Sequence, residues 1–572
     1  MAAPKQTSAS EELQYASGNL RRETGWWGAF VIGLAGTILV TGIAPVMVTQ
    51  LGASGIPVTV FITLTGWLLC LFLAELAAMM PERTGGSPSY AYPAFKDRWP
   101  KLAKHINGFT AWAYWLGWFP VAPLNMILAS FYLADRFHLN TTAGFTPIHT
   151  FIAWSTLIIS ILGILLFFIP AYRGIRVGAT FATILALLSM IPLTFIAIAW
   201  IFNPSVVHLA ELSGFPRLDG SSFFADMGGF SWWQVYVAYG FLLTWNVIAM
   251  EAAACYIGEC ANPDHDARIA MNLEGGYGVF IYTLIPIAFI VVLGAKALAD
   301  PSLADPKTIF VTFAGKVFPG IGGEVLNWII AFMLIIALAL SALNAIMGSG
   351  RAIYQMAIDG EFPTWFTKVN EHGVPARAMA FNVVASLIVV LMGGAVEIYS
   401  FSNVGYTVSF LPVLIGYFLL RQDKPDLRRP FKLPEFMKYG ALLLALVYFI
   451  FWLFGGIWYS KLGNVQIYYY LGWATLLAYL PFYWYRRYVE DKGLPFFILV
   501  DETREVMKRY GVWHRIGLDA WNIARPALFV IESEGTIRAV FVGETQAEFP
   551  TPDELNEILP ELQSSKVPKL QS

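Results

Sequence analysis

Residues 231–263 read SWWQVYVAYGFLLTWNVIAMEAAACYIGECANP, a long apolar run with a carboxylate just beyond its middle. Glu251 lies at a depth where a charged side chain costs roughly 2.5–3.5 kcal/mol on membrane-insertion scales. A carboxylate tolerated there usually faces a cavity or a partner and marks an ion or substrate path. The run ends in Gly-Glu-Cys-Ala-Asn-Pro, a signal for a helix end and a turn. Any function is therefore expected to centre on this segment.

The whole chain has the composition of an integral membrane protein. Of its 572 residues, 57% are hydrophobic and only 13% are charged, with a mean hydropathy of +0.58. A soluble protein of this length would carry about a quarter charged residues. A hydrocarbon core of roughly 30 Å is crossed by about twenty apolar residues in a helix. We expect twelve such helices, near residues 29–50, 57–80, 106–133, 150–169, 177–202, 231–257, 275–294, 324–348, 378–394, 397–420, 439–459 and 465–485.

Lysine and arginine in the short loops predict the orientation of these spans. If the N-terminus lies inside, every loop predicted on the inner side carries Lys or Arg. Most of these inner loops contain more Lys and Arg residues than the outer loops do. Both termini are therefore expected in the cytoplasm and the protein in the plasma membrane. No cleavable signal peptide is expected, because residues 1–25 are polar and the first apolar run is too long. Three parts follow: a tail at 1–24, a membrane domain at 25–488 and a soluble tail at 489–572.

Two of the predicted spans are interrupted by small or polar residues. Segment one contains Gly33 and then Gly36-Thr37-Ile38-Leu39-Val40-Thr41-Gly42-Ile43-Ala44-Pro45, and segment six is polar around Asn246. Five spans separate the two, an odd number, so the two halves would lie upside down relative to each other. Matching broken helices in inverted halves indicate the midplane site of a secondary transporter. The other explanation is that these small residues permit close helix packing.

Three blocks of sequence resemble one known family of transporters. Segment two ends in AELAAMMPERTGGSPSYAY (residues 74–92), and segment six ends in ECANP (259–263) followed by Asp266-Ala267-Arg268. After segment eight, SGRAIY (349–354) is followed by DGEFP (359–363) and GVP (373–375). In this order and spacing the blocks are similar to those of the amino acid–polyamine–organocation (APC) transporters.

The resemblance implies an all-α membrane fold of two inverted five-helix repeats, the leucine-transporter fold, plus two helices. The repeats would cover about residues 29–202 and 231–420, and the extra helices 439–485. In this family the substrate carboxylate binds backbone N–H groups at the break of segment one, which suits an anion. The matching positions are Thr41, Gly42 and Ile43. The substrate amino group would meet carbonyl groups of Ile38, Trp245 and Ile248.

The chain departs from the family pattern at three positions. The family's Gly-Ser-Gly in segment one is Val40-Thr41-Gly42 here, so Val40 is expected to occupy part of the cavity. A lysine that serves some members as a built-in cation, in segment five, is Ser189. An aromatic gate of some cationic exchangers, in segment eight, is Ala345.

Several polar residues have more than one possible role. Glu251 is the residue that couples transport to protons, a counter-charge for a cationic substrate, or a structural carboxylate bonded to the backbone of segment one or eight. Trp245 is a gate over the substrate or a packing residue. Asn246, Ser341 and Asn344 line the cavity or join helices through hydrogen bonds.

The soluble tail resembles half of another domain. An apolar strand at 496–500, a helix reaching Tyr510, strands at 527–531 and 536–542 and a last helix from Pro552 give a βαββα order. With RPALFVIESEGTIR (525–538), this order is similar to the C-terminal half of a peroxiredoxin-like, thioredoxin-fold domain. The last of the three cysteines is Cys260, so thiol chemistry in the tail is excluded.

The sequence therefore predicts a permease that moves amino acids or related amines by alternating access around broken helices one and six. Proton coupling or exchange is expected, with membrane lipid and a small-molecule substrate as partners. A sensor or scaffold that signals through the tail is the alternative. No enzyme activity, cofactor, metal site or nucleic-acid partner is expected, and the oligomeric state stays open.

Overall fold

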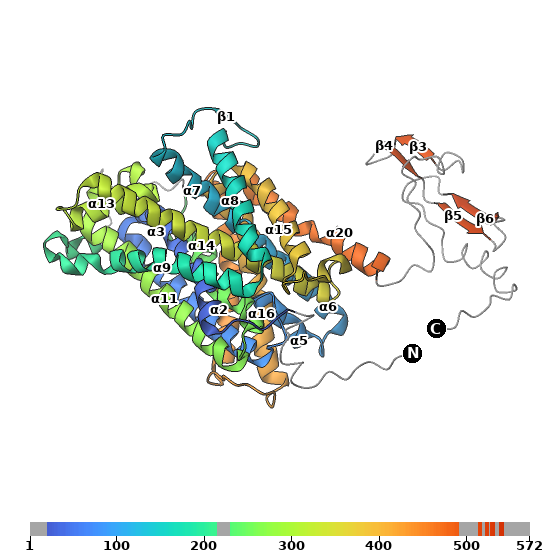
Figure 1. Cartoon of the computed structure of the whole chain (residues 1–572). Helices are drawn as coiled ribbons and strands as arrows, with labels where there is room; N and C mark the ends of the chain where they lie inside the picture. The colour runs from blue at the N-terminus through green and yellow to red at the C-terminus, as the bar shows by residue number, and fades with distance from the viewer. Residues whose placement is uncertain are drawn as a thin grey trace. The chain divides into compact units, whose positions relative to one another are not determined.

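In the computed structural model, residues 20–213 and 229–490 are described, with four strand segments at 513–516, 521–524, 527–531 and 537–542. The chain divides into two compact units, residues 1–493 and 494–572. The described part of the first unit is almost entirely helical, and that of the second consists of strands (Figure 1). The strand predicted at 496–500, the helix reaching Tyr510 and the helix from Pro552 lie outside the described residues.

The elements up to residue 213 occur in this order: α2 (Trp26–Gly33), η2 (Leu34–Leu39), α3 (Val40–Leu51), η3 (Gly52–Ser54), α4 (Gly55–Met79), η4 (Ser87–Tyr90), α5 (Ala91–Phe95), α6 (Pro100–Trp118), α7 (Val121–Arg136), β1 (Gly144–Phe145), β2 (Ile152–Ala153), α8 (Trp154–Tyr172), α9 (Ile175–Ala199), η5 (Trp200–Phe202), η6 (Pro204–Val206) and η7 (Leu209–Leu212). The labels η2 to η12 mark 3-10 helices.

The second half contains α10 (Trp232–Val247), η8 (Ile248–Cys255), η9 (Ile257–Glu259), α11 (Pro263–Leu293), α12 (Ala295–Leu298), η10 (Pro301–Ala304), α13 (Pro306–Val317), α14 (Gly323–Ile358), η11 (Thr364–Thr367), α15 (Ala376–Val389), η12 (Val390–Met392) and α16 (Ala395–Asp423). Then follow α17 (Met437–Ile450), the π-helix η13 (Phe451–Gly455), α18 (Gly456–Leu462), α19 (Gln466–Leu477), α20 (Tyr479–Trp484) and the π-helix η14 (Tyr485–Glu490).

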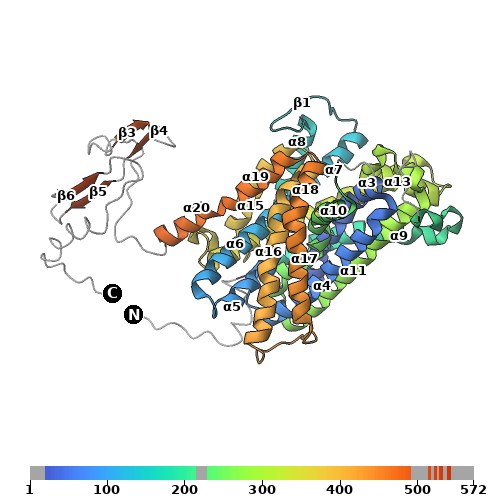
Figure 2. The ribbon, with the colours of Figure 1, turned by 180° about the vertical axis from the view of Figure 1, so that it is seen from behind.

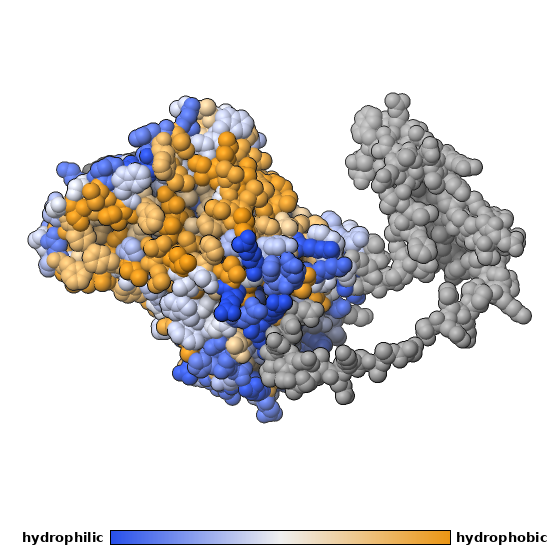
Figure 3. Space-filling model, in the orientation of Figure 1, coloured by the Kyte–Doolittle hydropathy of each residue, from blue (hydrophilic) through white to orange (hydrophobic). Residues whose placement is uncertain are grey.

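Helices of membrane-spanning length dominate the first unit. Nine helical runs in the described residues are long and apolar enough to cross a membrane. The first extends from Trp26 to Met79, and η3, with a positive φ of 55° at Gly52, separates α3 from α4 within it. A shorter apolar helix covers Ala376–Met392. Apolar side chains cover a broad part of this unit's surface, with hydrophilic side chains toward its ends (Figure 3). The chain is a multi-pass membrane protein, as its composition predicts.

The predicted interruptions of segments one and six are stretches of 3-10 helix. η2 joins α2 to α3, and η8 follows α10 for eight residues, longer than the usual run of about three or four. In η2 the chain stays helical, because the N–H of Val40 still bonds the carbonyl of Thr37. The interruption is therefore a change of helix type without an unwound gap. Such a stretch within a long helix often marks a hinge.

The two 3-10 segments cross with their backbones in contact. A Cβ atom added to Gly36 in η2 would lie 1.9 Å from the carbonyl oxygen of Ala249 in η8. Only glycine permits this approach, because any side chain would overlap the facing backbone. α11 packs against both segments and against α4, and α16 lies against α6 and α17 (Figure 2). The crossing is thus enclosed by helices that are far apart in the sequence.

The described strands of the second unit form two antiparallel hairpins. β5 (Ala527–Ile531) pairs with β6 (Ile537–Val542), at the positions where the sequence predicts strands. β3 (Trp513–Ile516) pairs with β4 (Trp521–Ala524), a hairpin that the sequence reasoning missed. Trp513, Ile516, Trp521 and Ile523 give this region the apolar and aromatic content that favours strands.

Replacing Gly36 with alanine should separate η2 from η8. We expect Gly36→Ala to lower the free energy of unfolding by about 1–3 kcal/mol, the usual cost of an overpacked core. Thermal unfolding in detergent, followed by tryptophan fluorescence, measures the change. Gly276→Ala in α11 is the matched control, because a Cβ atom there meets nothing within 4 Å. Equal unfolding temperatures for the two variants would show that the close crossing does not matter.

Candidate functional site

The start of α3 has an aromatic cover supplied by two distant helices. A Cβ atom on Gly42 would lie 2.9 Å from the hydroxyl oxygen of Tyr399 in α16. The Tyr399 ring lies 4.9 Å, centroid to centroid, from the indole of Trp245 in α10. The Trp245 N–H donates to the carbonyl of Gly117 at 3.1 Å, which fixes the indole against α6. Gly42 is half-buried beside the Tyr399 hydroxyl, so any side chain there would have to displace that hydroxyl.

The other predicted substrate contacts lie at or beside the same crossing. Ile38 and Ile248 are buried in η2 and η8, and Thr41 and Ile43 are buried in α3. The carbonyl oxygen of Ile38, predicted to meet the substrate amino group, accepts the hydroxyl of Thr41 at 2.9 Å. A backbone N–H at the end of η2 also bonds this oxygen, so both of its lone pairs are used in this packed arrangement.

A tyrosine that the sequence reasoning missed joins the two interrupted helices. The hydroxyl of Tyr282 in α11 lies 3.0 Å from the carbonyl oxygen of Gly36 and 2.7 Å from that of Asn246. One carbonyl belongs to η2 and the other to the end of α10. A hydroxyl has a single proton to donate, so it serves one carbonyl at a time. Tyr282 therefore holds both helices at the point where their regular hydrogen-bond pattern changes.

The three amide and hydroxyl side chains predicted for the cavity are buried and largely bonded to protein. The Asn246 side chain donates to the carbonyl of Leu242 at 3.0 Å, and its oxygen has no partner in the described residues. Ser341 accepts from Asn125 at 3.1 Å. Asn344 accepts the hydroxyl of Tyr256, and its side-chain N–H groups have no partner in the described residues. Asn246 and Asn344 thus keep one free polar group each.

Glu251 is held by three side chains on one of its oxygens. The hydroxyls of Tyr114 and Tyr406 donate to Oε1 at 2.8 and 3.0 Å, and the indole N–H of Trp118 donates at 3.2 Å. These three donors are side chains of α6 and α16. The structural role considered from the sequence had Glu251 bonded instead to the backbone of segment one or eight. Oε2 has no hydrogen-bond partner in the described residues, although it is buried. This arrangement leaves one carboxylate oxygen available for a proton.

The three sequence blocks that resemble the APC transporters meet at one end of the helical unit. Arg351 in α14 forms a fully buried ion pair with Glu259 at the end of η9. Gln355, one turn further, accepts from the N–H and the hydroxyl of Thr84 at 3.2 Å. Asp359 pairs with Arg83 after α4. Ion pairs buried this deeply are stable only when every partner is present, because a lone buried charge costs several kcal/mol.

Glycine conformation brings these blocks together. Gly85 has a positive φ of 85°, and a Cβ atom there would lie 2.9 Å from the carbonyl oxygen of Arg351. Gly86 has a φ of 82° and would meet the hydroxyl of Tyr114 at 2.9 Å. Side chains rarely adopt this backbone region, so the paired glycines are required by conformation and by space.

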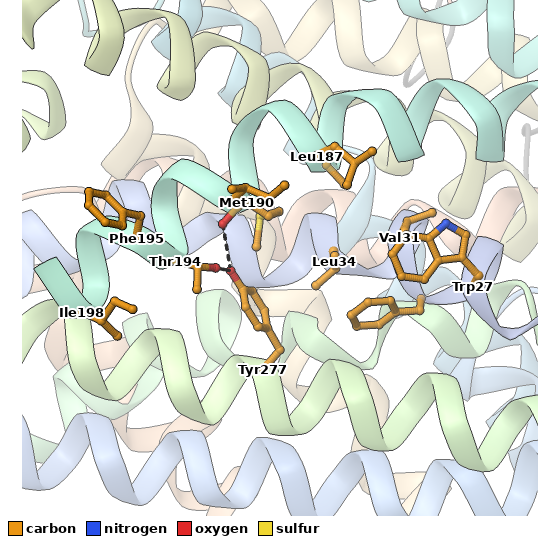
Figure 4. A pocket seen from close by; sticks show the side chains of 12 residues that line it. Trp27, Val31, Leu34, Leu187, Met190, Thr194, Phe195, Ile198 and Tyr277 are labelled. Atoms are coloured by element: carbon orange, nitrogen blue, oxygen red, sulfur yellow. Dashed lines mark hydrogen bonds between the residues drawn. The ribbon is translucent and has the colours of Figure 1, made fainter.

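An apolar groove lies on the side of the unit formed by α2, α9 and α11, apart from the predicted contacts. It has a volume of about 410 Å³ and is lined by apolar side chains such as Trp27, Leu187 and Phe195. The hydrogen-bonded hydroxyls of Thr194 and Tyr277 are its polar part (Figure 4). Exposed side chains such as Ile191 and Leu187 border it, so it opens on an apolar surface. None of the predicted substrate residues lines it.

Residues 25–476 match the family described as amino acid permease. The chain belongs to this family. The D-serine/D-alanine/glycine transporter of Escherichia coli K12 is one relative of this permease. The two are 21% identical over 384 residues, which cover 63% of this chain and 73% of that protein. The large neutral amino acids transporter small subunit 2 of Rattus norvegicus is 24% identical over 221 residues, 37% of each chain.

A third relative covers a shorter part of the permease. Solute carrier family 7 member 12 of Mus musculus is 26% identical over 174 residues, so the match spans about a third of that protein, 35%. A solved manganese transporter of Eremococcus coleocola shares the fold at 12% identity, with a TM-score of 0.50 over 85% of this chain and 97% of that chain.

Residues 483–540 match the AhpC/TSA family, in agreement with the predicted resemblance of the tail.

A side chain at Gly42 should block the space under Tyr399. We expect Gly42→Val to reduce amino acid uptake at least about tenfold, because the branched side chain needs the position that the Tyr399 hydroxyl occupies. Radiolabelled uptake into proteoliposomes, normalised to reconstituted protein, measures this loss.

Gly315→Val in α13 is the control, because a Cβ atom there meets nothing within 4 Å. Uptake by Gly42→Val at the level of this control would mean that the start of α3 does not face the substrate.

A decarboxylated amine transported as well as its parent amino acid would show that the amides of Thr41, Gly42 and Ile43 do not bind a carboxylate.

Proposed function

We propose that this protein is a secondary active transporter of amino acids or related amines. The observation that carries the proposal is the enclosed crossing of η2 and η8 beside Gly42, Trp245 and Tyr399. Two interrupted helices that meet inside a membrane unit are the feature by which secondary transporters bind their substrate. Membership of the amino acid permease family supports amino acids as the substrate class.

The membrane topology that fits this function has twelve spans. Dividing Trp26–Met79 at η3 and counting Ala376–Met392 and the helices after Gln466 gives that number. Segments one to five and six to ten would form the inverted repeats, with the interrupted helices first in each. The end that carries Arg83, Arg351 and Arg421 would face the cytoplasm, because short inner loops are rich in Lys and Arg.

The chemistry near Gly42 favours a zwitterion. The N–H groups at the start of α3 would bind the carboxylate once η2 opens, since they carry partial positive charge at the start of a helix. The carbonyl of Ile38, released from its present bonds when η2 opens, and the carbonyls of Trp245 and Ile248 would accept from the amino group. The relatives named for D-serine, D-alanine, glycine and large neutral amino acids make these the first substrates to test.

Counterflow in proteoliposomes tests transport without any assumption about coupling. Liposomes loaded with an unlabelled amino acid should accumulate the same labelled amino acid from outside, and protein-free liposomes should not. A panel of glycine, alanine, serine, leucine, arginine and putrescine separates neutral amino acids from cationic ones and from amines. Binding of one of these compounds without counterflow would favour the alternative, a membrane sensor or scaffold that signals through the tail.

Glu251 is proposed as the residue that couples transport to protons. Its free oxygen Oε2 would bind the proton, and the three donors on Oε1 would hold the carboxyl in place in both states. Glu251→Gln should still exchange substrate but lose proton-driven accumulation, because the amide keeps size and hydrogen bonding and does not titrate. The measurement is uptake across an imposed pH gradient, with Glu324→Gln, an exposed site, as control. Unchanged accumulation by Glu251→Gln would make Glu251 structural.

The C-terminal tail is proposed to be dispensable for transport and free of enzyme activity. It contains no cysteine, and a peroxiredoxin-type reaction requires a thiolate. A chain ending near Glu490 should bind substrate with unchanged affinity in a thermal-shift titration. Lost binding in this truncated chain, or peroxidase activity of the full chain, is the result that contradicts the proposal.

A further inference from the structure

One face of α11 runs along both interrupted helices. Glu274, Gly278 and Tyr282 are four residues apart, so their side-chain positions follow one another on the same face of the helix. Tyr282 bonds the carbonyls of η2 and α10 described above. Gly278 leaves space that the side chain of Met250 from η8 fills. Glu274 completes this row, and it has no role in the site as described so far.

Glu274 touches both interrupted helices. It is fully buried, and its Oε2 accepts the N–H of Ala253 in η8 at 3.0 Å, with the N–H of Ala252 facing the same carboxyl. A Cβ atom on Gly33 at the end of α2 would lie 2.6 and 2.7 Å from its two oxygens. The carboxyl therefore fills the space left by Gly33 and binds the backbone of η8.

Its second oxygen has no hydrogen-bond partner in the described residues. Among the described residues, the titratable groups near Glu274 are Glu251 in η8, Cys70 in α4, Cys255 at the end of η8 and Tyr256 directly after it. None of these four carries a positive charge. The only charge among them at neutral pH would be that of Glu251, which has the same sign.

Without a cation, an ionised carboxyl at this place is costly. Burial of a charge requires pairing and full hydrogen bonding, and Glu274 has only backbone N–H groups on one oxygen. Glu251, by contrast, has three donors on a single oxygen. Of the two carboxyls, Glu274 is the one whose packed environment requires a proton. When η2 and η8 separate and water enters, that requirement disappears.

We propose that Glu274 is a second proton-binding carboxyl of the transport cycle, which binds its proton when η2 and η8 are packed and releases it when they separate. The proton is held on Oε1 while Oε2 accepts from η8, and it passes to water on opening. The proton thereby favours the packed conformation, as any ligand favours the state that it binds more tightly. This inference rests on the proposed transport function.

The test replaces the titratable group and, separately, displaces it. Glu274→Gln keeps the acceptor for the N–H of Ala253 but binds no proton. Gly33→Ala leaves the carboxyl in the chain but overlaps both of its oxygens and the backbone N of Ala253, so it separates α2 from the bonded pair of Glu274 and η8. The controls are Glu371→Gln, an exposed loop site, and Gly276→Ala in α11, where added bulk meets nothing within 4 Å. Proteoliposomes containing the full chain are assayed for counterflow, accumulation across a pH gradient, and protons moved per substrate with an internal pH dye.

For Glu274→Gln we expect counterflow within about twofold of wild type, together with a fall of roughly tenfold in pH-driven accumulation, in the usual range of coupling between two ligands. Fewer protons should move per substrate than in wild type. Gly33→Ala should show the same loss, and both controls should behave as wild type. The number of protons per substrate is the readout that a merely structural carboxyl would not change.

Wild-type accumulation and proton count in Glu274→Gln would overturn the inference while leaving the transport function intact. The Glu274→Gln variant could instead lose both counterflow and accumulation while its unfolding temperature stays unchanged. This result would assign Glu274 to the packing of η8 and would also overturn the inference. Absence of counterflow in the wild type, for every substrate of the panel, would instead refute the proposed function. The failures of the two proposals are therefore distinguishable.

Discussion

Inside a membrane, backbone N–H and C=O groups have no water to bind, so a helix can change its hydrogen-bond pattern only where protein supplies partners. This constraint governs the crossing of η2 and η8. The Tyr282 hydroxyl lies within hydrogen-bond distance of the carbonyls of Gly36 and Asn246 and donates to one of them at a time, and Glu274 accepts from the N–H of Ala253. All of these partners come from α11. The interrupted helices can therefore exist because a third helix completes their hydrogen bonding.

The same helices are brought into contact by the absence of side chains. Gly33 and Gly36 leave space for a carboxyl and for a carbonyl, and Gly85 and Gly86 allow the segment after α4 to reach α14. At that end of the unit, the Arg351–Glu259 ion pair joins η9 to α14. A rearrangement of η8 relative to α14 would have to preserve this pair or expose both charges to water together, because either one alone would be a buried charge without a partner. The end of the unit that carries this ion pair is thus connected to the crossing through η8 and η9.

Much of the fold could be predicted from the sequence, because a membrane requires long apolar helices and the family's motifs carry its turns. The predicted spans match the helices within a few residues in most cases. The two interrupted segments were predicted from Gly33, Gly36 and the polar residues near Asn246. The break expected at Val40-Thr41-Gly42 is wrong in detail, because these residues form the first turn of α3 and the 3-10 stretch ends before them. The form of the interruption could not be predicted, since a 3-10 helix and an unwound gap use the same glycine and threonine residues.

The site was less predictable, because its covering side chains come from distant helices. Nothing in the residues around Tyr399, Tyr406 or Tyr282 separates them from the other tyrosines of an aromatic-rich chain. Glu274 was missed for a different reason. The predicted span began at residue 275 and so left out Glu274, whereas α11 begins twelve residues earlier, at Pro263, and places Glu274 inside the helix. A carboxylate within an apolar helix is the signal that would have identified it.

The central claim is that an amino acid binds where η2 meets the start of α3, beside η8. Hydrogen–deuterium exchange of the purified protein, with and without the amino acid that gives the strongest counterflow, tests it directly. The account predicts slower exchange at the amides of residues 41–43 and 248–255 in the presence of substrate, and unchanged exchange in α17 and α18. Protection confined to other helices, under conditions where a thermal shift proves binding, would contradict it.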